Sequence, residues 1–114
     1  MKLEQQVANL ELSKKLKELG VKQESLFWWM KTNNGDEYVL GRVHSRPHNE
    51  TVSTFTVAEL GEMLPVNFHL SMFRTLNGQW GVELDTNEQI SYRNDTEADA
   101  RAQMLIYLLE NKLI

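Results

Sequence analysis

Apolar residues recur with a helical period in three segments of the chain. The first is LELSKKLKEL, whose leucines predict an amphipathic helix over about residues 10–19. The second begins at Thr56 with the capping box TVAE and ends near Pro65. The third is DTEADARAQMLIYLLENKLI, from Asp95 onward, in which acidic residues favour a helix start and a wide apolar stripe follows. A stripe of this width is typical of a helix that lies across a sheet.

Alternation of apolar and polar positions predicts strands between these helices. Asn-Gly pairs at 34–35 and 77–78 supply the positive φ that tight hairpin turns require, and such turns join antiparallel strands. The element order is therefore α-β-β-(β)-α-β-β-β-α, where the bracket marks a short β-branched segment. The predicted strands are residues 25–31, 38–44, 51–55, 67–76, 79–84 and 89–93.

These elements predict a single α+β domain over residues 1–114. In the expected two-layer arrangement, three helices pack on the one apolar face of a mainly antiparallel sheet, and the other face is left bare. Residues 1–9 are polar with scattered apolar positions, and we expect them to form a flexible lead-in.

The aromatic run ESLFWWMK, residues 24–31, raises a question about this sheet. Successive side chains of a strand point to opposite faces, so Leu26, Trp28 and Met30 share one face and Phe27 and Trp29 share the other. A sheet that is covered on one face buries only one of these two sets of side chains. The other set then lies on the open face, together with other aromatic and arginine side chains.

An open patch of aromatic rings and arginines has the composition of protein-interface hot spots. It also resembles the stacking surfaces that bind single-stranded nucleic acid. The alternative is plain packing, in which the surplus rings lie against residues 1–9 or beneath a helix on the second face. The candidate partner-binding residues are Trp28, Trp29, Tyr38, Arg42, His44, Phe73 and Arg93.

Composition and charge narrow the possible partners. Apolar residues make up 41% of the chain and charged residues 25%, as in globular proteins. The absence of cysteine excludes disulfides and thiolate metal sites. The net charge of −4 works against non-specific binding to nucleic acid, so a protein partner or a homodimer is favoured. No apolar stretch is long enough to span a bilayer or to act as a signal peptide, and we expect a cytoplasmic protein without a membrane partner.

The sequence offers no convincing catalytic or metal-binding motif. His44 and His48 have an H-x3-H spacing, but Pro47 places them in a turn, where this spacing no longer directs both rings to one side. His69 and Ser71 would share a strand face, although about 6–7 Å apart along it, which is too far for direct contact. Nucleotide-binding glycine loops are absent from the sequence. We therefore expect a non-enzymatic protein with no cofactor and no metal.

Three segments of the chain resemble a group of small uncharacterised proteins found in bacterial genomes and in phages or prophages. They are LELSKKLKELGVKQESLFWW (Leu10–Trp29), FTVAELGEMLP (Phe55–Pro65) and DTEADARAQMLIYLLENKLI (Asp95–Ile114), and they cover nearly half of the chain. The resemblance implies a phage-related setting in a bacterial host cell, and it supplies no activity and no catalytic residues. We expect a phage-type accessory protein that binds another protein or itself through the open sheet face, with single-stranded nucleic-acid binding as the alternative.

Overall fold

The computed structural model describes residues 2–32, 37–42, 51–65, 69–85 and 90–114. The α+β class and the element order expected from the sequence are confirmed, with a short 3-10 helix, η1, added at the start. The helices are η1 (Leu3–Gln5), α1 (Leu10–Glu18), α2 (Val57–Met63) and α3 (Glu97–Glu110). The strands are β1 (Phe27–Lys31), β2 (Tyr38–Gly41), β3 (Thr51–Thr54), β4 (Leu70–Arg74), β5 (Trp80–Leu84) and β6 (Ile90–Asn94).

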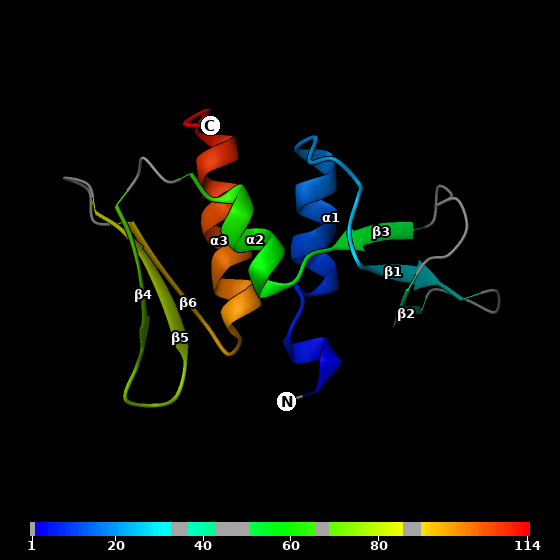
Figure 1. Ribbon diagram of the computed structural model, residues 1–114, viewed down its shortest axis with the longest axis horizontal. Helices are drawn as coiled ribbons and strands as arrows, with labels where there is room; N and C mark the ends of the chain where they lie inside the picture. The colour runs from blue at the N-terminus through cyan, green and yellow to red at the C-terminus, as the bar shows by residue number, and fades with distance from the viewer. Residues whose placement is uncertain (1, 33–36, 43–50, 66–68, 86–89) are drawn as a thin grey trace.

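The strands divide into two antiparallel sheets, whereas the sequence led us to expect one. The first sheet has the order β2-β1-β3 and the second has the order β4-β5-β6. The helices lie between the two sheets, as Figure 1 shows, and the molecule is elongated, with extents of 47, 32 and 21 Å. Each sheet is therefore covered by helices on one side, because α1 packs against β3 and α3 packs against β5 and β6. Alternation identifies the apolar side of a strand, but it does not say which helix covers that side.

The second sheet and α3 form most of the core. The register places Met72, Val82 and Tyr92 side by side on the face that meets α3, and Val82 is fully buried. Burial raises the pKa of Tyr92, and the nearby charges of Tyr107 and Glu110 raise it further. The hairpin predicted around Asn77-Gly78 is thus confirmed, with its apolar side turned inward.

Side chains cap the first turns of α1, α2 and α3. The Asn9 side chain accepts a hydrogen bond from the backbone N–H of Leu12, and Thr56 and Glu59 form the expected capping box. For α3, the Thr96 hydroxyl accepts the backbone N–H of Asp99. These caps satisfy N–H groups that the first turn of a helix leaves without partners.

Gly61 in α2 makes room for a salt bridge on α3. A Cβ at this position would lie 2.5 Å from Nη1 of Arg101. The Arg101 guanidinium donates to one carboxylate oxygen of Glu97 through Nε at 3.0 Å and Nη2 at 2.8 Å. Glycine at this position therefore leaves room for the Arg101 side chain of α3.

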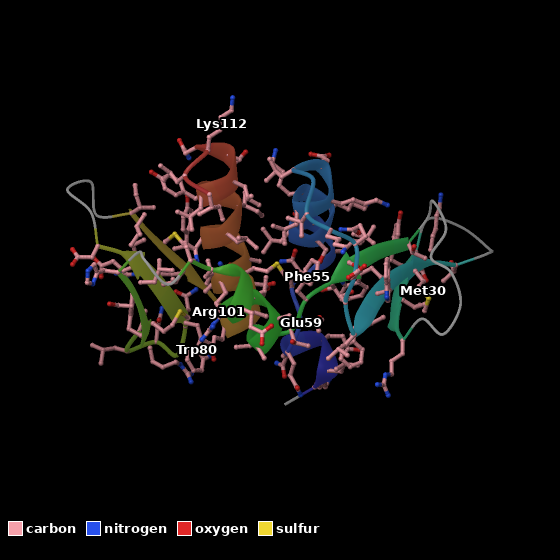
Figure 2. All side chains as sticks on the ribbon, turned by 45° about the horizontal axis from the view of Figure 1, so that its top comes forward. Met30, Phe55, Glu59, Trp80, Arg101 and Lys112 are labelled. Carbon is pink, nitrogen blue, oxygen red and sulfur yellow. The ribbon has the colours of Figure 1, made fainter. Side chains whose placement is uncertain are left out.

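Ala8 joins the first sheet to the helical layer. Its backbone N–H donates to the carbonyl of Phe55 at 3.1 Å. Its own carbonyl oxygen accepts three side-chain hydrogen bonds, from Thr54 Oγ1 at 2.6 Å, Trp29 Nε1 at 3.1 Å and Ser13 Oγ at 3.3 Å. Phe55 lies near the middle of the molecule, whereas Met30 lies toward the far end of the first sheet (Figure 2). The three donors come from α1, β1 and β3.

Residues 7–9 therefore belong to the packed structure. Val7 and Ala8 are fully buried, and Val7 forms a β-bridge with Thr56. The backbone N–H of Asn9 donates to Oδ1 of Asp99 at 2.8 Å, which links the start of α1 to the first turn of α3. The flexible lead-in that we expected over residues 1–9 does not extend to these three residues.

Thr54→Val tests the hydrogen bonds to Ala8. Valine has nearly the shape of threonine but has no hydroxyl donor, and Thr54 is fully buried. The other two donors still satisfy the carbonyl, so we expect the free energy of unfolding to fall by about 1 kcal/mol, the net value of one hydrogen bond. Urea denaturation measures this loss. Ser71→Ala, on an exposed position of β4, is the control and should change stability by less than about 0.5 kcal/mol.

Candidate functional site

The structure shows where the two sets of side chains on β1 lie. Trp29 points toward the helical layer, since its indole N–H reaches the carbonyl of Ala8. Phe27 shares that face, whereas Leu26, Trp28 and Met30 lie on the opposite one. Trp28 is nevertheless only 6% exposed, while Leu26 is 56% exposed. One tryptophan is thus buried, and the other packs against the N-terminal segment, which was the plain-packing alternative.

The face that carries Trp29 also gathers cations and further aromatic rings. The register pairs Trp29 with Leu40 and Lys31 with Tyr38, so β1 and β2 present these side chains together. We call this surface the cation–aromatic face and define it as Lys14 of α1 with Phe27, Trp29, Lys31, Tyr38, Leu40 and Arg42. Because α1 packs against β3, the part formed by β1 and β2 extends beyond this helix (Figure 1).

Two cation–π contacts organise this face. The Nζ atom of Lys14 lies 4.7 Å from the centroid of the Tyr38 ring. The guanidinium carbon of Arg42 lies 5.9 Å from the centroid of the Phe27 ring. Both rings are half-buried and both cations are exposed. Such contacts contribute about 0.5–1 kcal/mol each at exposed sites, so they hold long, mobile cationic side chains over the rings.

The charge of this face is opposite to that of the chain as a whole. Arg42 of β2 and Lys14 of α1 are exposed cations that lie over the aromatic rings of this face. The chain itself carries a net charge of −4. The face can therefore attract an acidic group and offer it an aromatic and aliphatic surface nearby.

The seven candidate residues do not form one patch. Trp29, Tyr38 and Arg42 share the cation–aromatic face, and Trp28 lies buried on the other side of the same sheet. His44 lies outside the described residues. Phe73 and Arg93 belong to the second sheet, beyond the helical layer. The prediction of a single open face is therefore wrong, because the strands form two sheets and the candidate residues are divided between them.

Phe73 has a structural role on the bare face of the second sheet. A Cβ on Gly81 would lie 2.2 Å from Cζ of Phe73, so the end of the ring covers this glycine. The guanidinium carbon of Arg93 lies 5.8 Å from the centroid of the same ring. The neighbours along this face, Ser71 and Glu83, are polar and paired in register. An aromatic ring that covers a strand glycine stabilises the sheet and explains Phe73 without a partner.

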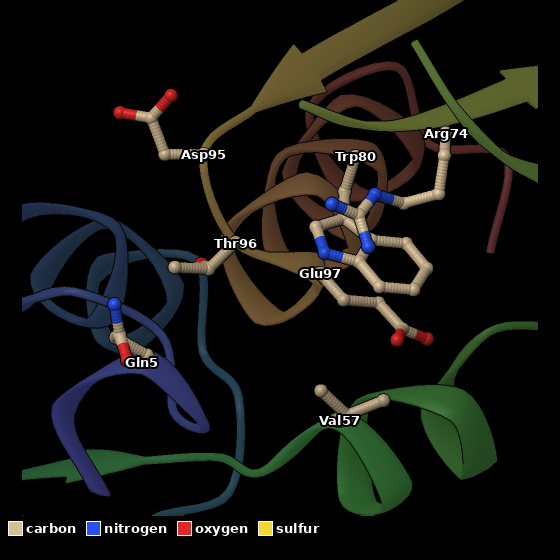
Figure 3. A pocket seen from close by; sticks show the side chains of 7 residues that line it. All are labelled: Gln5, Val57, Arg74, Trp80, Asp95, Thr96 and Glu97. Atoms are coloured by element: carbon tan, nitrogen blue, oxygen red, sulfur yellow. The ribbon is translucent and has the colours of Figure 1, made fainter. Parts of the chain in front are cut away.

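A cavity of about 260 Å³ lies at the end of the second sheet, and Figure 3 shows its lining. The Arg74 guanidinium carbon lies 4.3 Å from the centroid of the Trp80 ring, and its Nη2 donates to the carbonyl of Gly78. Thr96 caps α3 and Glu97 binds Arg101, so these polar groups are engaged within the fold. The lining residues are Gln5, Val57, Arg74, Trp80, Asp95, Thr96 and Glu97. We regard this cavity as a weaker candidate than the cation–aromatic face.

Sequence reasoning missed Lys14, Phe27, Lys31 and Leu40 as members of the site. Local periodicity could not relate Lys14 to a strand more than 20 residues later. Within the described part of the chain, no three histidine, cysteine or acidic side chains are grouped so that they could hold a metal ion. No helix there is both long enough and apolar enough to cross a membrane.

Comparisons with protein-family models, with curated proteins and with solved structures found no match. The resemblance to phage and prophage proteins therefore stays a prediction from the sequence.

Gly81→Ala tests the structural role of Phe73. The added Cβ would force the ring off the strand, and we expect the free energy of unfolding to fall by about 1–3 kcal/mol. In a Phe73→Ala background the same change meets no ring and should cost far less. Urea denaturation of the four proteins gives the coupling between the two positions. Additive effects would show that the ring does not depend on this glycine.

Proposed function

We propose that this chain is a non-enzymatic accessory protein that binds another protein, or a second copy of itself, through the cation–aromatic face. The observation that carries the proposal is the meeting of Trp29, Tyr38 and Arg42 on one partly open surface with Lys14 beside them. The resemblance of three segments to phage and prophage proteins supports a setting in the cytoplasm of a bacterial host.

The composition of this surface supports a protein partner. Tyrosine, tryptophan and arginine are the residues most enriched in interface hot spots, because they bury a large area and also offer polar contacts. Tyr38 and Leu40 are half-buried, so docking would remove their remaining apolar surface from water. Exposed cations at the edge would steer an acidic partner and contribute more to recognition than to affinity.

Single-stranded nucleic acid is the second candidate. Cations held over aromatic rings are also the arrangement that tracks a phosphate backbone and stacks bases, and Lys14 over Tyr38 is such a pair. The net charge of −4 opposes this function, because binding of phosphates depends on clustered cations. We therefore place it second.

Tyr38→Ala and Arg42→Glu test the proposed function. Tagged protein is recovered from bacterial cells that produce it, and bound protein is quantified, while sedimentation equilibrium measures self-association. We expect each substitution to weaken binding by about tenfold or more, as for hot-spot residues. Arg93→Glu is the matched control, since it makes the same charge change beside Phe73 on the other sheet. Equal binding by Arg42→Glu and Arg93→Glu would contradict the proposal.

The salt dependence of binding separates the two candidates. Affinity for labelled oligothymidylate should fall by orders of magnitude between roughly 50 and 200 mM salt if several phosphates are bound. An aromatic protein interface should respond far less, because burial of apolar area is not screened by ions. Tight, salt-sensitive binding of the oligonucleotide, lost in Arg42→Glu, would favour the second candidate.

A further inference from the structure

The two edges of the first sheet differ. At the β3 edge, Nζ of Lys17 donates to the carbonyl of Thr51 at 2.9 Å. Oε1 of Gln23 accepts the backbone N–H of Ser53, also at 2.9 Å. These side chains occupy peptide groups that would otherwise pair with a further strand. Covering an edge in this way is a common protection against unwanted strand pairing.

At the β2 edge, the peptide groups of Tyr38 and Leu40 point away from the sheet. In an antiparallel ladder, both peptide groups of a residue point to the same side, and successive residues alternate. The backbone N–H of Thr32 donates to the carbonyl of Glu37, so Glu37, Val39 and Gly41 face β1. Tyr38 and Leu40 must then face outward. Among the described residues, none pairs with the N–H or the carbonyl of Leu40.

Side chains beside this edge define what a strand added there would meet. On one face it would meet Tyr38 and Arg42, with Lys14 over the tyrosine ring. On the other face it would meet Val39, which is 49% exposed, and Met30, whose methyl carbon lies against Gly41. A strand that complements both faces alternates acidic and apolar residues, with the acidic ones on the side of Arg42.

We propose that the partner is a protein with an extended segment of alternating acidic and apolar residues, which adds to β2 as an antiparallel strand. The inference rests on the proposed function and names its mode of binding. The edges of the second sheet fit this partner less well. On their outward face Arg93 of β6 already lies over Phe73 of β4, beside Ser71 and Ser91, and α3 covers the inward face of β5 and β6.

A titration of the 15N-labelled full chain with the peptide acetyl-Glu-Val-Glu-Val-Glu-Val-amide tests the proposal. We expect the largest amide shift changes at Leu40 and Tyr38, with slower hydrogen exchange at these two amides. The peptide in which lysine replaces each glutamate should not bind, since it would meet Lys14 and Arg42. Shift changes confined to the second sheet, or no changes, would overturn the proposal.

Leu40→Pro and Leu40→Ala form a matched pair. Proline removes the outward N–H of Leu40 and leaves the bonds between β1 and β2 in place, as proline does on edge strands. Alanine removes the leucine side chain but keeps the donor. We expect Leu40→Pro to bind the peptide about tenfold or more weakly than Leu40→Ala. Equal affinities of Leu40→Pro and Leu40→Ala would overturn strand addition. If Arg42→Glu still lost binding in that case, the proposed binding surface would be supported without strand addition.

N-methylated peptides test strand addition to β2 without any change to the protein. A residue paired opposite Leu40 turns its side chain to the Arg42 side, so it is a glutamate, and its N–H faces β2. N-methylation of the glutamates should therefore abolish binding, whereas N-methylation of the valines should be tolerated. Binding that survives both modifications would show that the peptide does not add as a strand.

Discussion

Three hydrogen-bond donors converge on the carbonyl oxygen of Ala8, in a part of the protein from which water is excluded. A buried carbonyl without partners costs free energy comparable to a lost hydrogen bond, so this group has to be satisfied from within the fold. Ser13, Trp29 and Thr54 supply the donors, and each comes from a different element. This single atom therefore ties α1, β1 and β3 to the N-terminal segment.

The helices divide the strands into two separate sheets. With its N-terminal segment placed against β3, α1 covers one side of the first sheet, and α3 is left to cover the second. The helices pack on one another between the two sheets, with α3 contacting both α1 and α2. Seven side chains of α3 are buried, which agrees with its central place. One helix cannot cover three strands of the first sheet, so the half formed by β1 and β2 remains partly open.

The half of the first sheet formed by β1 and β2 contributes both to packing and to the proposed binding surface. Trp29 fixes the strand through its indole N–H and also forms part of the surface beside it. Lys14 and Arg42 lie over aromatic rings, so the surface has defined cation positions although the side chains are long. The second sheet shows the contrasting case, in which Phe73 covers Gly81 and the remaining bare face is polar. Trp29 and Phe73 were both candidate partner-binding residues, but Trp29 forms part of the partly open surface whereas Phe73 covers a glycine of its own sheet.

The sequence by itself determined the local features of this protein. The cap at Thr56, the turn at Asn77-Gly78 and the apolar side of the strands in the second sheet depend on residues only a few positions apart. The tertiary structure alone decided which helix covers which sheet, and therefore which candidate residues meet. Thr54 reaches Ala8 across 46 positions and Trp29 reaches it across 21. Periodicity says that a side chain must leave water, but only packing between distant segments chooses what it meets, because every apolar face satisfies the hydrophobic requirement equally well.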